Sequence, residues 1–267
     1  MKKNFSVLLL LTACFSLTVA CSKQESKSSD TSTTQSQSES LSTSFSSSSK
    51  EEVEKSNFID SVKTYYGKPG VDNFYITGEV KVNKDSEIKP GIYDLVIEQG
   101  RGNVMSTQSI ISENYVAASA GNSEDNEETL SKIRMFLTQD EILKFSNISK
   151  ASLKQVNLPE KPSDELGTGD WIVGIDIAPG TYKLSSNYDV NANKDGQFYP
   201  RMEFKIIQFS EDGKKEKIAN DNKYNHDNSD VLVKLQDNQI IQIIADSYGQ
   251  YNGVKPDDMK LKFNKVN

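Results

Sequence analysis

The hydrophobic and polar positions divide the chain into three regions with different patterns. A lysine pair precedes residues 5–20, which are mostly apolar, and residues 21–49 then contain 14 Ser and 4 Thr but only two bulky apolar residues. From about residue 71 onward, short apolar segments alternate with Gly, Asn and Asp. The pattern predicts an export leader at 1–20, a disordered tether at 21–49 and a β-rich body.

Residues 50–67 have the periodicity of one short amphipathic helix. Ser49 and Glu52 have the spacing of a capping box, and Gly67 followed by Pro69 supplies a stop. Large apolar residues recur between these signals near a helical period: Val53, Phe58, Ile59, Val62, Tyr65 and Tyr66. We expect this apolar face to pack against the domain that follows.

The body contains an internal repeat. Residues 87–95 read EIKPGIYDL and residues 176–184 read DIAPGTYKL, so that an acid, Ile, Pro-Gly, Tyr and Leu coincide at an offset of 89 residues. A second match, which includes Leu137 and Leu235, has an offset of 98 residues. The sequence therefore predicts a mainly β fold of two tandem small β-sandwich-like repeats, at 71–158 and 164–267.

In both copies the Pro-Gly pair predicts a type II turn followed by a strand. Proline presets φ at the first central position of such a turn, and Gly91 or Gly180 would supply the positive φ at the second. Tyr93 and Tyr182 follow two residues later and share a strand face with the next leucine. We therefore expect both tyrosines to pack in the core rather than to contact a ligand.

The end of the leader resembles a bacterial lipobox. Residues 17–21 read LTVAC, in which small residues precede a cysteine whose thiol accepts a diacylglyceryl group before cleavage. Residues 11–14, LTAC, are the competing site, but they leave an apolar segment of only about seven residues, at the short end of the usual range. The resemblance implies a mature chain that begins at an acylated Cys21 and is anchored on the extracellular face of the cell membrane.

The second copy resembles a module of Gram-positive surface proteins. Residues 171–182 read WIVGIDIAPGTY, which is similar to a "vG.DI.pGtY" pattern of secreted and lipid-anchored proteins in these bacteria. The first copy lacks the Trp and has Lys84-Asp85 in place of the Val-Gly step. The resemblance implies a small β-sandwich at the cell surface and assigns no activity to it.

Composition excludes several classes of site. The chain has 31 Lys plus Arg against 38 Asp plus Glu, a net charge of −7, one His and two Cys. The acidic balance argues against a nucleic-acid partner, which needs clustered positive charge. One histidine and two cysteines in the leader are too few for a multi-histidine metal site or a disulfide framework. We expect no cofactor.

Calcium is the one metal that the sequence suggests. Asn191, Asn193 and Asp195 precede Gly196 with the spacing that opens a calcium loop, in which alternate oxygens converge on the ion. Position 12 of such a loop is Met202, however, and its side chain carries no ligand oxygen. Asn, Asp and Gly are also the usual residues of any long hairpin loop.

Aromatic loop residues are the candidates for a ligand surface. Tyr199, Tyr248 and Tyr251 lie in or beside predicted loops, where tyrosine offers contact area to a protein or a sugar ring at low entropic cost. His226, in the segment YNHDN, is the only imidazole, and we interpret it as a loop residue rather than a catalytic base.

These features together predict a lipid-anchored, non-enzymatic binding or adhesion module of the cell envelope with a protein or glycan ligand. Two alternatives stay open. One is a calcium-stabilised structural spacer, and the other is an envelope hydrolase that would depend on His226 or on a pair of acids.

Overall fold

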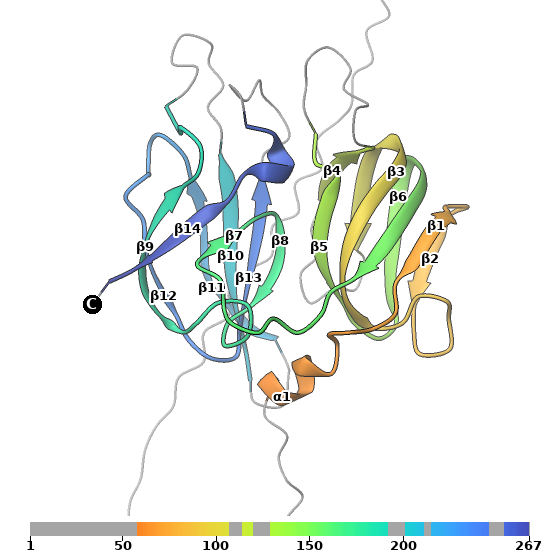
Figure 1. Ribbon diagram of the computed structural model, residues 1–267, viewed down its shortest axis with the longest axis horizontal. Helices are drawn as coiled ribbons and strands as arrows, with labels where there is room; N and C mark the ends of the chain where they lie inside the picture. The colour runs from red at the N-terminus through yellow and green to blue at the C-terminus, as the bar shows by residue number, and fades with distance from the viewer. Residues whose placement is uncertain are drawn as a thin grey trace, which may run out of the picture. The chain divides into compact units, whose positions relative to one another are not determined.

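The folded part of the chain, in a computed structural model, is mainly β, as the sequence predicts (Figure 1). The structure describes residues 58–106, 114–119, 129–191, 201–210, 215–245 and 254–266. The predicted leader, the predicted tether and residues 50–57 of the predicted helix lie outside these ranges. Residues 52–267 form one compact unit.

The described strands before residue 158 all join one sheet. They are β1 (Val71–Tyr75), β2 (Glu79–Val82), β3 (Gly91–Ser106), β4 (Asn114–Ala118), β5 (Lys132–Leu137) and β6 (Glu141–Gln155). β3 is the centre of this group because it pairs with β4, β5 and β6. Its register against β6 shifts between Ile97 and Asn103, and such bulges allow a long strand to bend.

The later strands are divided between two sheets. They are β7 (Glu165–Leu166), β8 (Gly169–Ile172), β9 (Gly180–Ser186), β10 (Met202–Phe209), β11 (Lys215–Tyr224), β12 (Leu232–Leu235), β13 (Gln239–Ala245) and, after the 3-10 turn Pro256–Asp258, β14 (Leu261–Lys265). The larger sheet runs β1-β6-β3-β5-β8-β13-β10-β11, with β2 beside β6 and β4 beside β3. The smaller sheet runs β12-β9-β14-β7. Strands from both predicted repeats thus share the larger sheet.

The apolar face of helix α1 (Phe58–Lys63) packs on the folded unit, and the helix ends four residues before the predicted end at Gly67. It ends at Lys63, and a turn leads from there to Gly67, where φ is +69°. Phe58 and Val62 are buried, and the Phe58 ring stacks on Phe209 at 5.0 Å between centroids. Their core cluster also contains Ile92, Phe136, Val156, Ile172 and Ile240, so residues from both predicted repeats meet beneath the helix.

Tyr93 and Tyr182 are buried, as predicted, and make the same local contact. Tyr93 Oη donates to the Lys89 carbonyl at 3.0 Å, and Tyr182 Oη donates to the Ala178 carbonyl at 2.7 Å. Each ring folds back over the glycine two residues earlier.

The predicted reason for these glycines is wrong. Neither Gly91 nor Gly180 has a positive φ, so the positive-φ position of a type II turn does not explain them. A Cβ would lie 2.7 Å from the Tyr93 ring at position 91 and 3.2 Å from the Tyr182 ring at position 180. Glycine is present because the tyrosine ring occupies the space of a side chain.

A second local arrangement occurs before β6 and again before β13. Asp140 and Asn238 have positive φ values of 64° and 62° at the turn into these strands. One residue later, Glu141 accepts the Thr138 N–H at 2.7 Å, and Gln239 accepts the N–H of residue 236 at 2.8 Å. Glu141 and Gln239 are both buried, so these hydrogen bonds satisfy polar groups inside the fold.

Candidate functional site

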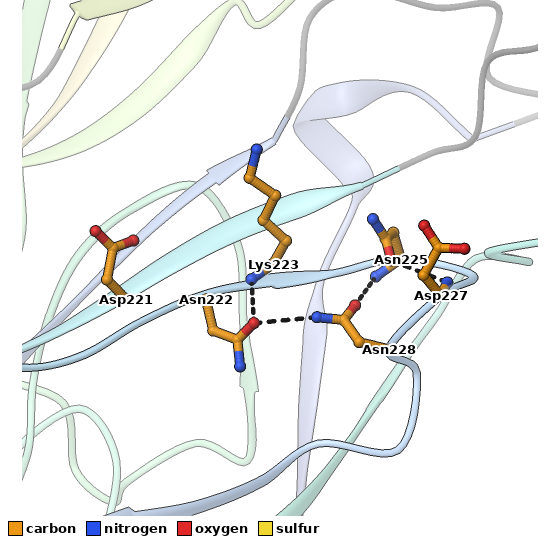
Figure 2. Close-up of a pocket in the computed structure, with 6 residues that line it drawn as sticks. All are labelled: Asp221, Asn222, Lys223, Asn225, Asp227 and Asn228. Carbon is orange, nitrogen blue, oxygen red and sulfur yellow. Dashed lines mark hydrogen bonds between the residues drawn. The ribbon is translucent and has the colours of Figure 1, made fainter.

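The candidate site is a polar hollow of about 420 Å³ at the end of β11 and in the loop after it (Figure 2). Its lining residues are Asp221, Asn222, Lys223, Asn225, Asp227 and Asn228. β11 is the end strand of the larger sheet, which leaves this loop open to solvent. Every lining side chain ends in an amide, a carboxylate or an ammonium group.

Hydrogen bonds among three asparagines hold the loop in shape. Asn222 Oδ1 accepts from Asn228 Nδ2 at 3.0 Å and from the Lys223 N–H at 2.8 Å. Asn228 Oδ1 accepts the Asn225 N–H at 3.1 Å, and Asn225 Oδ1 accepts the Asp227 N–H at 3.0 Å. Figure 2 shows this chain of bonds along the loop. The sequence therefore folds a run of loop-forming residues into a fixed polar frame.

Two carboxylates and one ammonium group add charge to the hollow. Asp221 and Lys223 project from the same face of β11, on the side away from the Asn222 amide (Figure 2). Lys223 Nζ pairs with Glu203 Oε1 at 3.0 Å, and Asp227 Oδ1 pairs with His226 Nε2 at 2.8 Å. The hollow can thus both donate hydrogen bonds to a ligand and accept them from it.

A larger hollow of about 740 Å³ lies between residues 161–164 and the ends of β9 and β14. Its aromatic lining residues, Tyr182 and Phe263, are buried and contact each other edge to face. Burial, followed by the Asp164 carboxylate, raises the pKa of the Tyr182 phenol. The Tyr182 hydroxyl already donates to the Ala178 carbonyl, and the polar lining of this hollow comes from Lys161, Ser163, Asp164, Asn264 and Lys265.

No protein-family model matches the chain, and no curated protein matches it. The site is therefore interpreted from its own geometry. Across the ranges that the structure describes, no helix is long and apolar enough to cross a bilayer.

A second group of charged side chains lies where β5 meets β8. The Arg134 guanidinium stacks on the Trp171 ring at 4.1 Å from its centroid, and its Nε donates to Asp94 Oδ1 at 3.1 Å. The Trp171 indole N–H donates to the Gly167 carbonyl at 2.8 Å. Arginine tolerates such a position because its planar group stacks and hydrogen-bonds at the same time.

Asp176 and Asp170 are the two fully buried carboxylates of this joint, and Asp176 has the more varied partners. Its Oδ2 accepts the Tyr66 hydroxyl at 2.7 Å and the Ile172 N–H at 2.8 Å, and its Oδ1 lies 3.8 Å from Arg134. Burial raises the pKa of the Asp176 carboxyl, although its three partners oppose this shift. Burial, followed by the charge of Asp176, likewise raises the pKa of Tyr66. These groups hold together helix α1 and the two halves of the folded unit, residues 71–158 and 164–267. Their burial keeps a ligand from reaching them.

Most residues predicted to form a site lie outside the described ranges. These are Cys21, Asn193, Asp195, Tyr199, Tyr248 and Tyr251. Asn191 is described and exposed, and its backbone N–H donates to Asp189 Oδ1 at 2.8 Å. Within the described part of the chain, no three His, Cys, Asp or Glu side chains come close enough together to hold a metal ion.

Sequence reasoning found the segment around His226 but missed the hollow. It interpreted YNHDN only as a loop, because a run of Asn and Asp does not reveal which amides bond to one another. It also passed over Tyr75, whose exposed fraction is 72% and whose ring lies 5.5 Å from Lys150 Nζ. Tyr75 stands between Phe74 and Ile76, so the local sequence gives no sign that its ring is exposed.

Proposed function

We propose that this protein is a lipid-anchored, extracellular and non-enzymatic binding module of the cell envelope, with Cys21 as its anchor. The ligand class that the candidate site favours is a hydroxyl-rich glycan. The observation that carries this choice is the lining of the hollow beside β11, which consists of amide, carboxylate and ammonium groups on a loop fixed by its own hydrogen bonds.

The chemistry of this lining suits sugars. A sugar hydroxyl both donates and accepts, so it pairs well with carboxylates that accept, ammonium groups that donate and amides that do both. The Asn222–Asn228 bond restrains the loop beforehand, which lowers the entropic cost of binding. The hollow is open to solvent, as expected of a site for part of a long polymer rather than for a small enclosed metabolite.

The proposed anchor follows from the amino-terminal sequence. A diacylglyceryl group on Cys21 would supply the two acyl chains that stable membrane attachment requires. If residues 21–49 form a flexible tether, its r.m.s. reach is roughly 30 Å by the scaling for flexible chains. That distance would separate the binding unit from the lipid headgroups.

We further propose that the two halves are copies of one β-module. Four correspondences support this. Both copies have the tyrosine–glycine contact, and both have the positive-φ turn, before β6 in one and before β13 in the other. Gly91 pairs with Leu137 as Gly180 pairs with Leu235, and a Thr-Gly-acid segment opens both β2 and β8. Gly78 and Gly169 in that segment have φ values of 139° and 131°.

A glycan array with the full chain tests the proposed ligand class. Asp221→Ala and Lys223→Ala remove head groups without removing the asparagine frame, and each should lower the signal on any bound glycan several-fold. Lys217→Ala is the matched control, because Lys217 is exposed on the same strand but outside the hollow. Absence of glycan binding, or equal binding by all variants, would reject the proposal.

A further inference from the structure

The contact between β5 and β8 has a defined geometry that can be compared with other strand edges. Arg134 and Gly169 face each other in a parallel bridge, and the Arg134 N–H donates to the Thr168 carbonyl at 3.4 Å. Two residues along, the Phe136 N–H donates to Asp170 Oδ2 at 3.0 Å. The edge of β8 thus supplies one carbonyl and one carboxylate to the edge of β5.

Glycine at position 169 is explained by this contact. Its φ of 131° is unfavourable for any residue with a side chain, and a Cβ there would lie 2.4 Å from the Arg134 carbonyl oxygen. Two residues after Gly169, the Trp171 ring stacks against the Arg134 guanidinium. The backbone conformation of β8 is therefore matched to the strand that packs against it.

The corresponding segment of the first half has the same conformation, but none of the strands that the structure describes packs on it. Thr77-Gly78-Glu79 corresponds to Thr168-Gly169-Asp170, and Gly78 has a φ of 139°. Nothing lies within 4 Å of the position that a Cβ at Gly78 would take. β2 pairs with β6 along one side, and residues 77–79 are exposed. This edge has the conformation of the edge that β8 offers to β5, and no residue in the described ranges occupies it.

The counterpart of β5 is β12, and it is also an open edge. Leu232 faces Lys183 in β9 as Arg134 faces Asp94 in β3, so Leu232 stands at the position of Arg134. β12 is the end strand of the smaller sheet. The Leu232 side chain is a large apolar group with an exposed fraction of 63%. β12 and β2 lie toward opposite sides of the folded unit in Figure 1.

We propose that β12 of one copy of this chain docks on β2 of a second copy, in the arrangement by which β5 meets β8 within the chain. The Leu232 N–H would donate to the Thr77 carbonyl of the second copy, and the Lys234 N–H would donate to its Glu79 carboxylate. Leu232 would pack on Val80, the counterpart of Trp171. The inference rests on the correspondence between the two halves and is independent of any glycan ligand.

The side chains at the two open edges are complementary. The internal pair Arg134–Trp171 is replaced by Leu232 and Val80, so one cation–π contact is exchanged for one apolar contact. The two acids that flank Arg134, Asp94 and Asp176, correspond to Lys183 and Glu87. Lys183 Nζ already pairs with Asp230 Oδ1 at 2.6 Å in its own chain, and in the docked pair it would also face the Glu87 carboxylate of the other copy.

The contact is heterologous and weaker than the internal joint. Because β2 and β12 are different surfaces, copies would add head to tail and form an open row. The apolar cover that helix α1 gives the internal joint would be missing, since Thr181 and Lys234 stand where Ile92 and Phe136 lie beneath the helix. A membrane surface would favour such a row because it concentrates tethered copies.

Cysteine cross-linking tests the proposal. Two differently tagged full-length copies are expressed together in a bacterium that exports lipoproteins. One copy carries Val80→Cys and the other carries Leu232→Cys, and a short bismaleimide reagent should give a cross-linked heterodimer, because two residues of strand offset place these positions beyond the reach of a disulfide. A chain with both substitutions should give a ladder of oligomers. Ile218→Cys paired with Val80→Cys is the matched control, because Ile218 is an exposed apolar residue on β11.

A second set of variants tests the proposed ion pair between Lys183 of one copy and Glu87 of the other, and controls for loss of folding. Lys183→Glu should weaken cross-linking up to roughly fivefold, the range for an exposed ion pair, and Glu87→Lys in the other copy should restore it. Glu79→Cys with Lys234→Cys provides an independent pair if a first variant melts below the wild-type temperature. The proposal would be overturned if neither cysteine pair gave a higher cross-linking yield than the Ile218→Cys control, in cells that carry wild-type amounts of the protein on their surface.

Discussion

At the scale of single residues, Asp176 is the charge on which three parts of the fold converge. It binds Tyr66 from the turn after α1, the backbone at the end of β8 and, more loosely, Arg134 of β5. Arg134 also pairs with Asp94, so two carboxylates share one guanidinium. Removal of the negative charge from Asp176 would leave the shorter Arg134–Asp94 pair intact.

The free energy of unfolding should therefore fall as the pH rises through the folded-state pKa of Asp176. In the unfolded chain the carboxyl titrates near its ordinary value of 3.8, and in the folded chain its pKa is raised. The folded state holds the proton over a wider pH range, so this stabilisation is complete below about 3.8 and is lost as the pH rises through the folded-state pKa. Asp176→Asn should remove that part of the pH dependence in urea unfolding measured across this range.

Asp85→Asn is the control for this measurement, because Asp85 is exposed in a turn of the first half. The control should keep the wild-type slope of unfolding free energy against pH. If Asp176→Asn kept that slope as well, the burial of Asp176 would not be the source of the pH dependence.

At the scale of elements, the two Pro-Gly-x-Tyr segments form a matched pair for mutation. Gly91→Ala should destabilise the protein by about 1–3 kcal/mol, because the new methyl group would push the buried Tyr93 ring off the Lys89 carbonyl. Gly180→Ala should cost less than about 1 kcal/mol, since its Cβ would lie 3.2 Å from the Tyr182 ring instead of 2.7 Å. Thermal unfolding of the two variants tests the order, and a larger loss at position 180 would contradict it.

These segments also show how far the sequence could predict the structure. The repeated Pro-Gly-x-Tyr pattern correctly predicted strands and buried tyrosines, because alternation along a strand depends on neighbouring residues. It gave the wrong reason for glycine, because the obstacle is a ring position that only side-chain packing determines.

The polar groups of the joint and of the hollow were beyond the reach of sequence patterns. Arg134 and Asp94 are 40 residues apart, and Tyr66 and Asp176 are 110 residues apart, so no local spacing marks either pair. The hollow beside β11 is local in sequence, but its form depends on which asparagine oxygen accepts from which donor. The sequence patterns included Tyr66, Trp171 and Asp176, but only as a helix position and as parts of the repeated motif, not as members of one joint.

At the scale of the whole molecule, the shared sheet and the cluster beneath helix α1 couple the two halves. Phe58→Ala should cost about 3–5 kcal/mol, because its buried ring stacks on Phe209 and lies in a cluster drawn from both halves. We expect one cooperative unfolding transition at a lower denaturant midpoint in this variant. Fluorescence of Trp171 in the joint and far-ultraviolet circular dichroism should report the same midpoint, and two separate transitions would indicate independent halves.

The proposed membrane anchor can be tested at the two candidate cysteines, Cys14 and Cys21. Cys21→Ser removes the thiol at the end of LTVAC, so the full chain should lose its anchor and pass into the medium of a host that processes lipoproteins. Cys14→Ser is the matched control and should leave the protein in the membrane fraction. The reverse result would assign the anchor to Cys14, and the apolar residues 15–20 would then begin the mature chain. Because a disordered tether needs a polar start, release by Cys21→Ser is the outcome that agrees with the composition of residues 21–49.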